Sequence, residues 1–583
     1  MCGIIGYKGG ANATEMVVHG LKRLEYRGYD SWGIAIKNDR IRVIKKIGRV
    51  GDFNEELPES SLAIGHTRWA THGGVTEANA HPHSDCSKKI QVVHNGIIEN
   101  YQELKQELIS KGHKFNSETD TEVIPHLIEE FMKSNDFECS TKLAIRKLKG
   151  NYAILAIHED ENKMVAARNG SPLVVGIKGK EYFIASDIPA FLNHTRDVAF
   201  LDDNEMVVLN GEIKFANLLN GKRINKNMSK VEWDIEQAQK GDYDHYMLKE
   251  IIEQKQSLIN ATTQDTQNIK DFADTINNSL GVFFVACGTA YHAALVGSYL
   301  FSSITKKHVN VVLGSEFPNC KDFINERSLI IPISQSGETA DVIASVKSAK
   351  EKGAKVYSIV NVAGSSLARY SDKFIPLGAG PEMAVASTKA FTSQVAILAL
   401  LAFACANKID EGKQKLNGLI SKVNMMMNES FLNCIKALAL QINKNDLFTI
   451  GRSINYPIAL EAALKIKEVS YIHAEGYAGG ELKHGPIALI EKNTPCIVFA
   501  SNDKNKYDII SNATEIKARG GYIIGVSPER NVLFDYWVFV PVAEELSPII
   551  NVIPAQLLAY YLALNKNLDP DKPRNLAKSV TVF

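Results

Sequence analysis

Residues 328–360 read SLIIPISQSGETADVIASVKSAKEKGAKVYSIV, and residues 494–526 read TPCIVFASNDKNKYDIISNATEIKARGGYIIGV. Both stretches follow one plan: an apolar strand, a polar loop, an amphipathic helix, a glycine and a second strand. Ser334 falls against Ser501 and Gly353 against Gly520, in each case 167 positions apart. Self-similarity at a fixed period indicates a duplicated unit. Strands that alternate with helices are typical of parallel α/β domains.

The duplication extends upstream, because FFVACGTAYHAAL (283–295) and FTIGRSINYPIAL (448–460) share a strand–glycine–helix pattern. We therefore predict two tandem αβα domains with parallel sheets, over residues 270–410 and 440–570, followed by a tail over 571–583. Residues 2–215 differ, since short strand-like runs alternate there with glycine turns and one clear helix is expected around YQELKQELISKG (101–112). The polar stretch 216–245 is predicted to be a linker.

Composition limits the possible partners. The 583 residues include 66 basic and 66 acidic ones, and this balance gives no support to nucleic acid or an anionic membrane as a partner. Apolar segments such as 394–404 are too short to span a bilayer. The eight cysteines contain no C-x-x-C pair. They are interpreted as reduced, individually buried thiols of a cytoplasmic protein, without disulfides or a zinc site.

The chain starts MCGIIGYKGG, with Cys2 directly before a short strand. If Met1 is removed, Cys2 carries both a thiol and an α-amino group that titrates near pH ~8. That amine could accept the thiol proton and so generate a nucleophile. Taken alone, a small residue at a disordered terminus is the simpler interpretation.

Polar clusters later in residues 2–215 favour the catalytic interpretation. Arg68 and Asp120 could hold the α-carboxylate and α-ammonium of an amino acid. Asn95 and Gly96 offer a side-chain amide and a backbone N–H, the pair that stabilises a tetrahedral oxyanion. Metal binding by the histidines at 66, 72, 81, 83 and 94 is disfavoured, because no metal-ligand spacing accompanies them.

Together with Cys2, the motifs LEYRGYDS, HTRWATHG, HNGIIEN and SETDTE resemble the class II glutamine amidotransferase domain. The resemblance implies an N-terminal-nucleophile αββα sandwich. It implies that Cys2 attacks the glutamine amide, that Asn95 and Gly96 hold the oxyanion, and that Arg27 helps to fix the terminus. The residues implied for glutamine binding are Arg27, Arg68, Trp69, Thr71, His72 and Asp120.

In the first copy of the repeat, the loop Ser334-Gln335-Ser336-Gly337-Glu338-Thr339 opens a helix. Hydroxyl and N–H groups at a helix N-terminus suit a phosphate, although a plain capping box would read the same. The second copy has SNDKNK at this place, so the serines are not needed to build the unit. This favours phosphate binding.

The stretch YPIALEAALKIKEVSYIHAE (456–475) places Glu461, Lys465 and Glu468 on one helical face among apolar neighbours. Such charges are usually a solvated face, but on a buried helix they need partners or a function. We favour a function. Downstream, GGELKHGP sets His484 in a glycine-flanked turn, a position suited to acid/base chemistry.

These motifs resemble a tandem pair of sugar isomerase domains. Joined to the first half, the resemblance implies transfer of the amide nitrogen of L-glutamine to fructose 6-phosphate with isomerisation, giving glucosamine 6-phosphate and glutamate, the first step of amino-sugar synthesis. It implies that Lys578 forms a Schiff base, Glu468 moves a proton and His484 assists ring opening across a homodimer interface. No cofactor and no metal are expected. The residues implied for sugar-phosphate binding are Cys287, Gly288, Thr289, Ser334, Gln335, Ser336, Thr339, Val385, Ser387 and Lys465.

Two alternatives and two departures accompany this interpretation. One alternative is another class II amidotransferase: the amidophosphoribosyltransferase family shares the first half but would need a phosphoribosyl-pyrophosphate motif of adjacent acidic residues after a strand, which is not found. The other is a non-catalytic sugar-phosphate sensor, which would not need Lys578 or Glu468. The family usually has a serine where this chain has Ala290, and bacterial relatives often end in an acid where it has Phe583. We expect the first change to weaken sugar binding and the second to be neutral.

Overall fold

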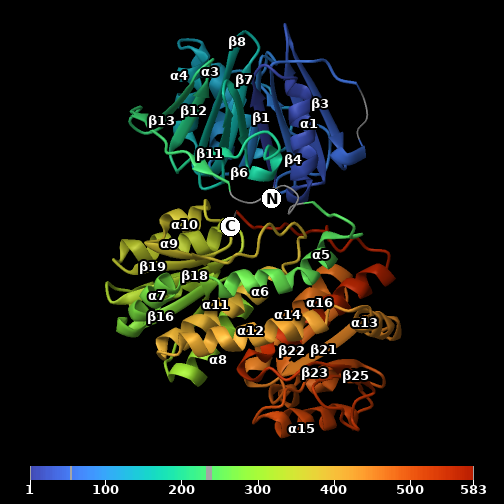
Figure 1. Cartoon of the computed structure of the whole chain (residues 1–583). Helices are drawn as coiled ribbons and strands as arrows, with labels where there is room; N and C mark the ends of the chain where they lie inside the picture. Colours follow the sequence, from blue (N-terminus) through green and yellow to red (C-terminus); the bar gives the residue numbers. More distant parts are fainter. Residues whose placement is uncertain (1, 53–55, 232–238, 582–583) are drawn as a thin grey trace. The chain divides into compact units, whose positions relative to one another are not determined.

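The computed structural model describes residues 2–52, 56–231 and 239–581 (Figure 1). The chain divides into two compact units, one formed by residues up to 238 with 577–583 and the other by 239–576. Each unit has its own sheets and its own hydrophobic core.

The first unit is built on two antiparallel sheets. One has the strand order β15-β11-β9-β10-β1-β4-β2-β3 and the other β14-β13-β12-β8-β7-β6-β5. The first contains β1 Gly3–Lys8, β2 Ser31–Lys37, β3 Ile41–Ile47, β4 Leu62–Arg68, β9 Val174–Lys178, β10 Glu181–Ala185, β11 Asp197–Phe200 and β15 Ser229–Lys230. The second contains β5 His83–Ser84, β6 Ile90–Ile98, β7 Gly150–His158, β8 Glu161–Asn169, β12 Glu205–Leu209, β13 Ile213–Asn217 and β14 Arg223–Ile224.

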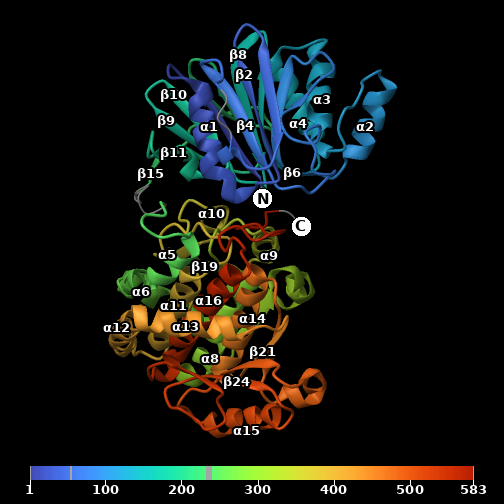
Figure 2. The ribbon, with the colours of Figure 1, turned by 90° about the vertical axis from the view of Figure 1, so that its right-hand side faces the viewer.

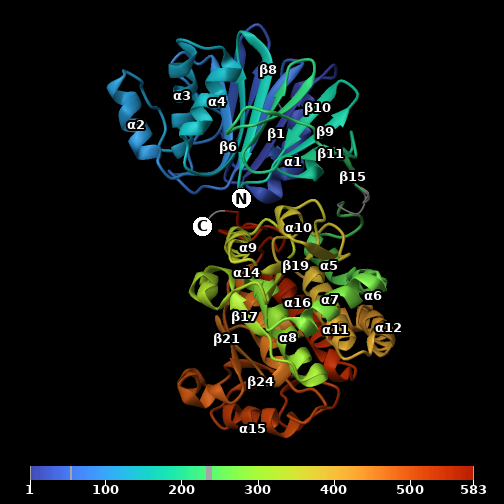
Figure 3. The same ribbon diagram turned by 90° about the vertical axis from the view of Figure 1, so that its left-hand side faces the viewer.

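Helices cover the outer faces of these two sheets. Helix α1 (Ala13–Leu24) packs on β1 and β4 (Figure 2), and α3 (Val123–Met132) packs on β6 beside α4 (Phe137–Lys147) (Figure 3). Because successive strand residues face opposite ways, Ile4 joins the core between the sheets while Ile5 packs toward α1. The predicted αββα sandwich is confirmed.

The second unit contains two five-stranded parallel sheets, with the orders β17-β16-β18-β19-β20 and β22-β21-β23-β24-β25. Their strands are β16 Gly281–Ala286, β17 Asn310–Leu313, β18 Ser328–Ser334, β19 Lys355–Val360, β20 Lys373–Pro376, β21 Asp446–Gly451, β22 His473–Ala478, β23 Pro495–Phe499, β24 Tyr522–Ser527 and β25 Tyr536–Phe539. Their helices are α5 Tyr246–Ile252, α6 Gln254–Thr262, α7 Thr266–Asn278, α8 Gly288–Thr305, α9 Ala340–Glu351, α10 Ser366–Tyr370, α11 Lys389–Cys405, α12 Ile409–Met425, α13 Glu429–Gln441, α14 Tyr456–Ser470, α15 Lys506–Lys517 and α16 Ser547–Asn565.

The predicted duplication is confirmed at the level of elements. The segment β18–α9–β19 corresponds to β23–α15–β24. In both copies the helix is followed by a glycine in the left-handed region, Gly353 with φ +78° and Gly520 with φ +84°. Glycine adopts this conformation without the steric penalty of a Cβ, which explains why the repeat has a glycine there.

One core joins the two halves of the second unit. Helices α8, α11, α14 and α16 lie between the two sheets and share a hydrophobic cluster with both (Figure 1). The segment Glu544–Asn565 is long and apolar enough to cross a membrane by length and composition, but 94% of its qualifying window is buried inside the protein. That burial is typical of a core helix.

The structure differs from the sequence expectations at three places. The stretch predicted as a linker from residue 216 contains β14 and β15, so the first unit continues to residue 238. Helices α1, α3 and α4 were not predicted. All eight cysteines are free, but the prediction that they are individually buried holds only for Cys405 and Cys496. Cys86 and Cys139 are exposed, and the other four are partly buried.

Candidate active sites

Cys2 directly precedes β1, where the pairing of Gly3 with Thr67 brings it beside the end of β4. The Trp69 N–H donates to its sulfur over 3.3 Å, and the thiol lies 3.4 Å from the Trp69 carbonyl oxygen. Burial raises the pKa of the Cys2 thiol, against the opposing effect of the positive charges of the chain terminus, Arg68 and Arg27. The resting thiol is therefore protonated and needs a base.

The backbone of Cys2 is anchored by two side chains. Its carbonyl oxygen accepts hydrogen bonds from Arg27 Nε at 3.2 Å and from Asn95 Nδ2 at 3.0 Å. Arg27 is itself held by Asp187, with 2.9 Å between Nη1 and Oδ2. The nucleophile is thus fixed against both sheets, because Asn95 belongs to β6.

His66 orients the Asn95 amide. Its Nε2 lies 3.0 Å from both the Asn95 Oδ1 and the His94 carbonyl oxygen, so this nitrogen carries the proton and donates to the two acceptors. Burial lowers the pKa of His66 to about 3 and keeps the ring neutral. With its oxygen held by His66, Asn95 presents its NH2 group toward Cys2. The sequence analysis considered His66 only as a metal ligand and missed this role.

Gly96 cannot be replaced by a larger residue without rearrangement. Its φ is +126°, and a Cβ added there would lie 1.9 Å from the Asn151 carbonyl oxygen on the neighbouring strand. Only glycine suits such a conformation.

The structure brings most of the predicted glutamine site into one pocket. Among the residues that line it are Cys2, Arg68, Trp69, Thr71, His72, Gly96 and Asp120. Three Arg68 N–H groups donate to the carbonyls of His72, Gly73 and Gly74, which leaves two of the five for a ligand. The Asp120 carboxylate accepts from the Ile98 N–H at 2.7 Å. A pocket with a thiol, a guanidinium and a carboxylate suits a small amino acid.

In the second unit, the loop between β18 and α9 is held by its own hydroxyls. Ser334 Oγ accepts from the Gly337 N–H at 2.9 Å, and Ser336 Oγ accepts from the Glu338 N–H at 3.2 Å. The Glu338 carboxylate accepts from Ser366 and does not close a capping box. Thr339 occupies the N-cap of α9 without a side-chain capping bond. This arrangement disfavours the capping-box alternative.

Charged groups on α14 form a buried cluster with the first turn of α8. Lys465 Nζ lies 2.6 Å from Glu468 Oε2 and donates to Thr289 Oγ1 at 2.9 Å. Glu461 accepts from that hydroxyl at 3.1 Å and lies 2.7 Å from His292 Nδ1. The side chains of Glu461 and Lys465 are 0% and 1% exposed, against 21% for Glu468. Burial alone would lower the pKa of Lys465, but the Glu468 and Glu461 carboxylates outweigh it and raise the pKa.

His292 was missed in the sequence analysis. It lies three residues after Thr289, on the same first turn of α8, and this helical spacing was the available signal. Cys287 is the N-cap of α8, and Gly288, the first residue of the helix, has φ +54°. Gln335 lies in the β18–α9 loop.

The remaining predicted residues belong to other segments of the chain. Ser387 donates to Glu382 at 2.8 Å, and the Val385 N–H donates to the Asp571 carbonyl oxygen at 3.0 Å. His484 is exposed in the short 3-10 helix Glu481–His484. Lys578 belongs to the tail 577–583 that groups with the first unit. Phe583 lies outside the described residues.

Known proteins match the whole chain. The glutamine amidotransferase domain family matches residues 66–193, and the SIS domain family matches 275–404 and 441–566. The glutamine–fructose-6-phosphate aminotransferases [isomerizing] of Pyrococcus horikoshii and Thermococcus kodakarensis are 45% and 46% identical to this chain, with both chains covered completely in each case. The solved C-terminal domain of glucosamine-fructose-6-phosphate aminotransferase from Francisella tularensis is 35% identical, with a TM-score of 0.54, and covers 57% of this chain and 100% of its own.

Proposed function

The chain belongs to the glutamine–fructose-6-phosphate aminotransferase [isomerizing] family, and from that premise we propose how its two units divide the reaction. It is a glutamine-dependent aminotransferase. Its substrates are L-glutamine and fructose 6-phosphate, and its products are glutamate and glucosamine 6-phosphate.

The first unit releases ammonia from glutamine. The α-amine of Cys2, exposed when Met1 is removed, accepts the thiol proton, and the thiolate attacks the amide carbon. Asn95 and the Gly96 N–H stabilise the oxyanion, ammonia leaves, and water hydrolyses the thioester to glutamate. Arg68, Asp120, Thr71, His72 and Trp69 bind the amino acid. The observation that carries this proposal is the Asn95 amide, which His66 orients so that its NH2 group donates to the carbonyl oxygen of Cys2.

The second unit binds and isomerises the sugar phosphate. The hydroxyls and N–H groups around Ser334, Gln335, Ser336 and Thr339 receive the phosphate at the start of α9. Lys578 forms an imine with the open-chain ketone, which acidifies the adjacent carbon. Glu468, the most exposed carboxylate of the α14 cluster, then moves the proton between C1 and C2.

Several further assignments are part of the proposal. Thr289, Val385 and Ser387 contact the sugar, and Cys287 and Gly288 shape the turn before Thr289. His484 assists ring opening from a second copy of the chain in a homodimer, which its exposed position permits. A cytoplasmic location agrees with eight free cysteines.

An assay of glutamate and glucosamine 6-phosphate, with and without fructose 6-phosphate, tests this function. We expect both products in equal amounts when both substrates are present. If glutamate forms at the same rate with and without fructose 6-phosphate, and no amino sugar forms, the protein is better explained as another amidotransferase. Sugar-phosphate binding without turnover would favour a sensor.

A further inference from the structure

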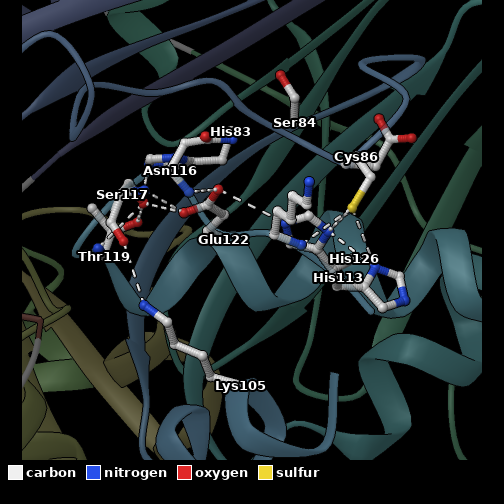
Figure 4. Close-up of polar contacts among 12 residues, drawn as sticks. His83, Ser84, Cys86, Lys105, His113, Asn116, Ser117, Thr119, Glu122 and His126 are labelled. Carbon is white, nitrogen blue, oxygen red and sulfur yellow. Dashed lines mark hydrogen bonds and ion pairs between the residues drawn. The ribbon is translucent and has the colours of Figure 1, made fainter. Parts of the chain in front are cut away.

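Four metal-binding groups converge in the first unit, away from the Cys2 pocket. Cys86, His113, His126 and Glu129 each offer one ligand atom, and these atoms lie within 4.8 Å of one another. Figure 4 shows the Cys86 sulfur facing the two imidazoles. Cys86 lies in the turn between β5 and β6, His113 follows α2 (Tyr101–Ser110), and His126 and Glu129 are one turn apart on α3. Three separate segments therefore meet at one point.

The distances within this cluster match the edges of a tetrahedral coordination sphere. The Cys86 sulfur lies 3.7 Å from His113 Nδ1 and 3.6 Å from His126 Nδ1, and the two Nδ1 atoms are 3.3 Å apart. Glu129 Oε2 lies 3.1 Å and 3.5 Å from the same nitrogens. A tetrahedral zinc ion with Zn–N of ~2.05 Å and Zn–S of ~2.3 Å separates its ligand atoms by roughly 3.3–3.6 Å. The five distances given above, from 3.1 to 3.7 Å, lie close to these edges.

The outer nitrogens of the two imidazoles face carboxylates. His113 Nε2 lies 3.2 Å from Glu130 Oε2, and His126 Nε2 lies 3.7 Å from Glu122 Oε1. A proton on each Nε2 is attracted to these oxygens, which leaves the Nδ1 lone pairs directed into the cluster. Carboxylates behind metal-bound imidazoles orient the rings in the same way at known zinc sites. With the protons on Nε2, the two Nδ1 lone pairs converge with the Cys86 sulfur and a Glu129 oxygen, an arrangement that suits a shared cation.

We propose that Cys86, His113, His126 and Glu129 bind one Zn²⁺ ion. The donor set of one thiolate, two imidazoles and one carboxylate suits this borderline-soft ion, whereas Mg²⁺ and Ca²⁺ prefer oxygen ligands. Four protein ligands leave no open coordination position, so the site is structural and not catalytic. Both imidazoles are buried while Cys86 is exposed, so the ion can enter from the sulfur side.

The ion would close a loop whose middle lines the Cys2 pocket. The segment 113–126 begins and ends at a ligand, and between them lie Thr119 and Asp120, which line that pocket. Glu122, behind His126, also accepts from the N–H groups of Asn116 and Ser117 at 2.8 and 2.7 Å (Figure 4). Zinc would therefore stabilise a wall of the pocket without touching the substrate. The metal site itself does not depend on the proposed function.

The test uses the purified full chain, its C86S variant and the matched control C139S, which alters another exposed cysteine of the same unit. Elemental analysis after dialysis should find one zinc per chain in the native protein and in C139S. Replacement by Co²⁺ should give the absorption of a tetrahedral site with a thiolate charge-transfer band. C86S should lose this band and bind zinc at least ten-fold more weakly.

A second readout keeps the test decisive if C86S folds poorly. Zinc added to the chelator-treated native protein should raise the melting temperature of the first unit by several degrees, because it binds only the folded cluster. Glu129→Gln should reduce this shift, and Glu103→Gln, the same change at an exposed position on α2, should not. The proposal is overturned if the native protein shows no thiolate band, or if zinc stabilises the native protein and both cysteine variants equally.

Discussion

At the scale of single residues, the glutamine site depends on hydrogen bonds that position a thiol and an amide. Cys2 is held through its carbonyl oxygen by Arg27 and Asn95, and Asn95 is held by His66. In the described part of the chain no histidine or carboxylate hydrogen-bonds the Cys2 sulfur. This environment is consistent with a mechanism in which the α-amine of Cys2 itself accepts the thiol proton.

Replacing Cys2 by Ala should abolish glutamate formation and leave isomerisation of fructose 6-phosphate intact, because Cys2 takes no part in the proposed isomerisation. Both reactions are measured on the same preparation, with Cys139→Ala as the control that keeps both. If Cys2→Ala remains folded but loses isomerisation as well, the division of labour is wrong.

The neutral state of His66 predicts a pH dependence of stability. Its pKa is about 3 in the folded protein against an ordinary value of 6.5, because burial disfavours the charged ring. The unfolded chain takes up a proton in this interval and the folded chain does not. The contribution of the neutral, buried His66 to the free energy of unfolding is therefore fully present above pH 6.5 and is lost as the pH falls toward 3.

Hydrogen exchange of β4 peptides between pH 7 and 4 can measure this loss after correction for intrinsic exchange. The opening free energy of the native protein should fall as the pH is lowered. In His66→Gln, the slope of this free energy against pH should be smaller, by the equivalent of about one proton. His19→Gln, at an exposed position on α1, should leave the slope unchanged. Equal slopes in the native protein and His66→Gln would contradict a neutral, buried His66.

At the scale of elements, α14 carries charges into the core of the second unit. Lys465 has Glu461 and Glu468 as ion partners and Thr289 as a hydrogen-bond partner. Removing one member of a buried ion pair leaves the other uncompensated, which costs about 3–5 kcal/mol.

Lys465→Met should therefore lower the free energy of unfolding of the second unit by about 3–5 kcal/mol. It should also impair sugar isomerisation. Lys467→Met, at an exposed position of the same helix, should change stability by less than about 0.5 kcal/mol. Chemical denaturation of both variants measures the difference. Similar stabilities for the two variants would show that the α14 cluster is not a coupled, buried network.

The sequence predicts some elements better than others for physical reasons. The face of α14 could be recognised because its charges lie at helical spacing among apolar residues. The spacing of His292 from Thr289 was also visible, but the contact of His292 with Glu461 joins two helices and could be seen only in the fold. Helix α1 left a readable signal that was missed, since Asn12 caps its first turn and Val17, Leu21 and Leu24 are buried at spacings of three and four. The Cys86 cluster has no such signal, because its three segments meet only after folding.

At the scale of the whole molecule, two units carry complementary chemistry on one chain. The repeat in the second half was visible at constant spacing, and the sheet-rich texture of the first half was visible in its glycine turns. The end of the first unit could not be predicted from the sequence. Strands β14 and β15 have only two residues each, and their mostly polar side chains are also typical of a linker. Nor could the sequence show that residues 577–583 group with the first unit.

The tail residue Lys578 is proposed to form the imine with the sugar. Borohydride reduction in the presence of fructose 6-phosphate should add the mass of the sugar phosphate to a peptide containing Lys578. Lys578→Arg keeps the charge and should lose this label together with synthesis, while Lys572→Arg in the same tail should lose neither. A label on another lysine would remove Lys578 from the mechanism.

The central claim is that the nitrogen released from glutamine at Cys2 is transferred to the sugar and does not come from free ammonium. The most direct measurement supplies glutamine labelled with nitrogen-15 in its amide, together with fructose 6-phosphate and unlabelled ammonium, and analyses the amino sugar by mass spectrometry. The account predicts glucosamine 6-phosphate that carries the label and forms in equal amount to glutamate. Amino sugar that carries mainly unlabelled nitrogen, or glutamate without amino sugar, would contradict it.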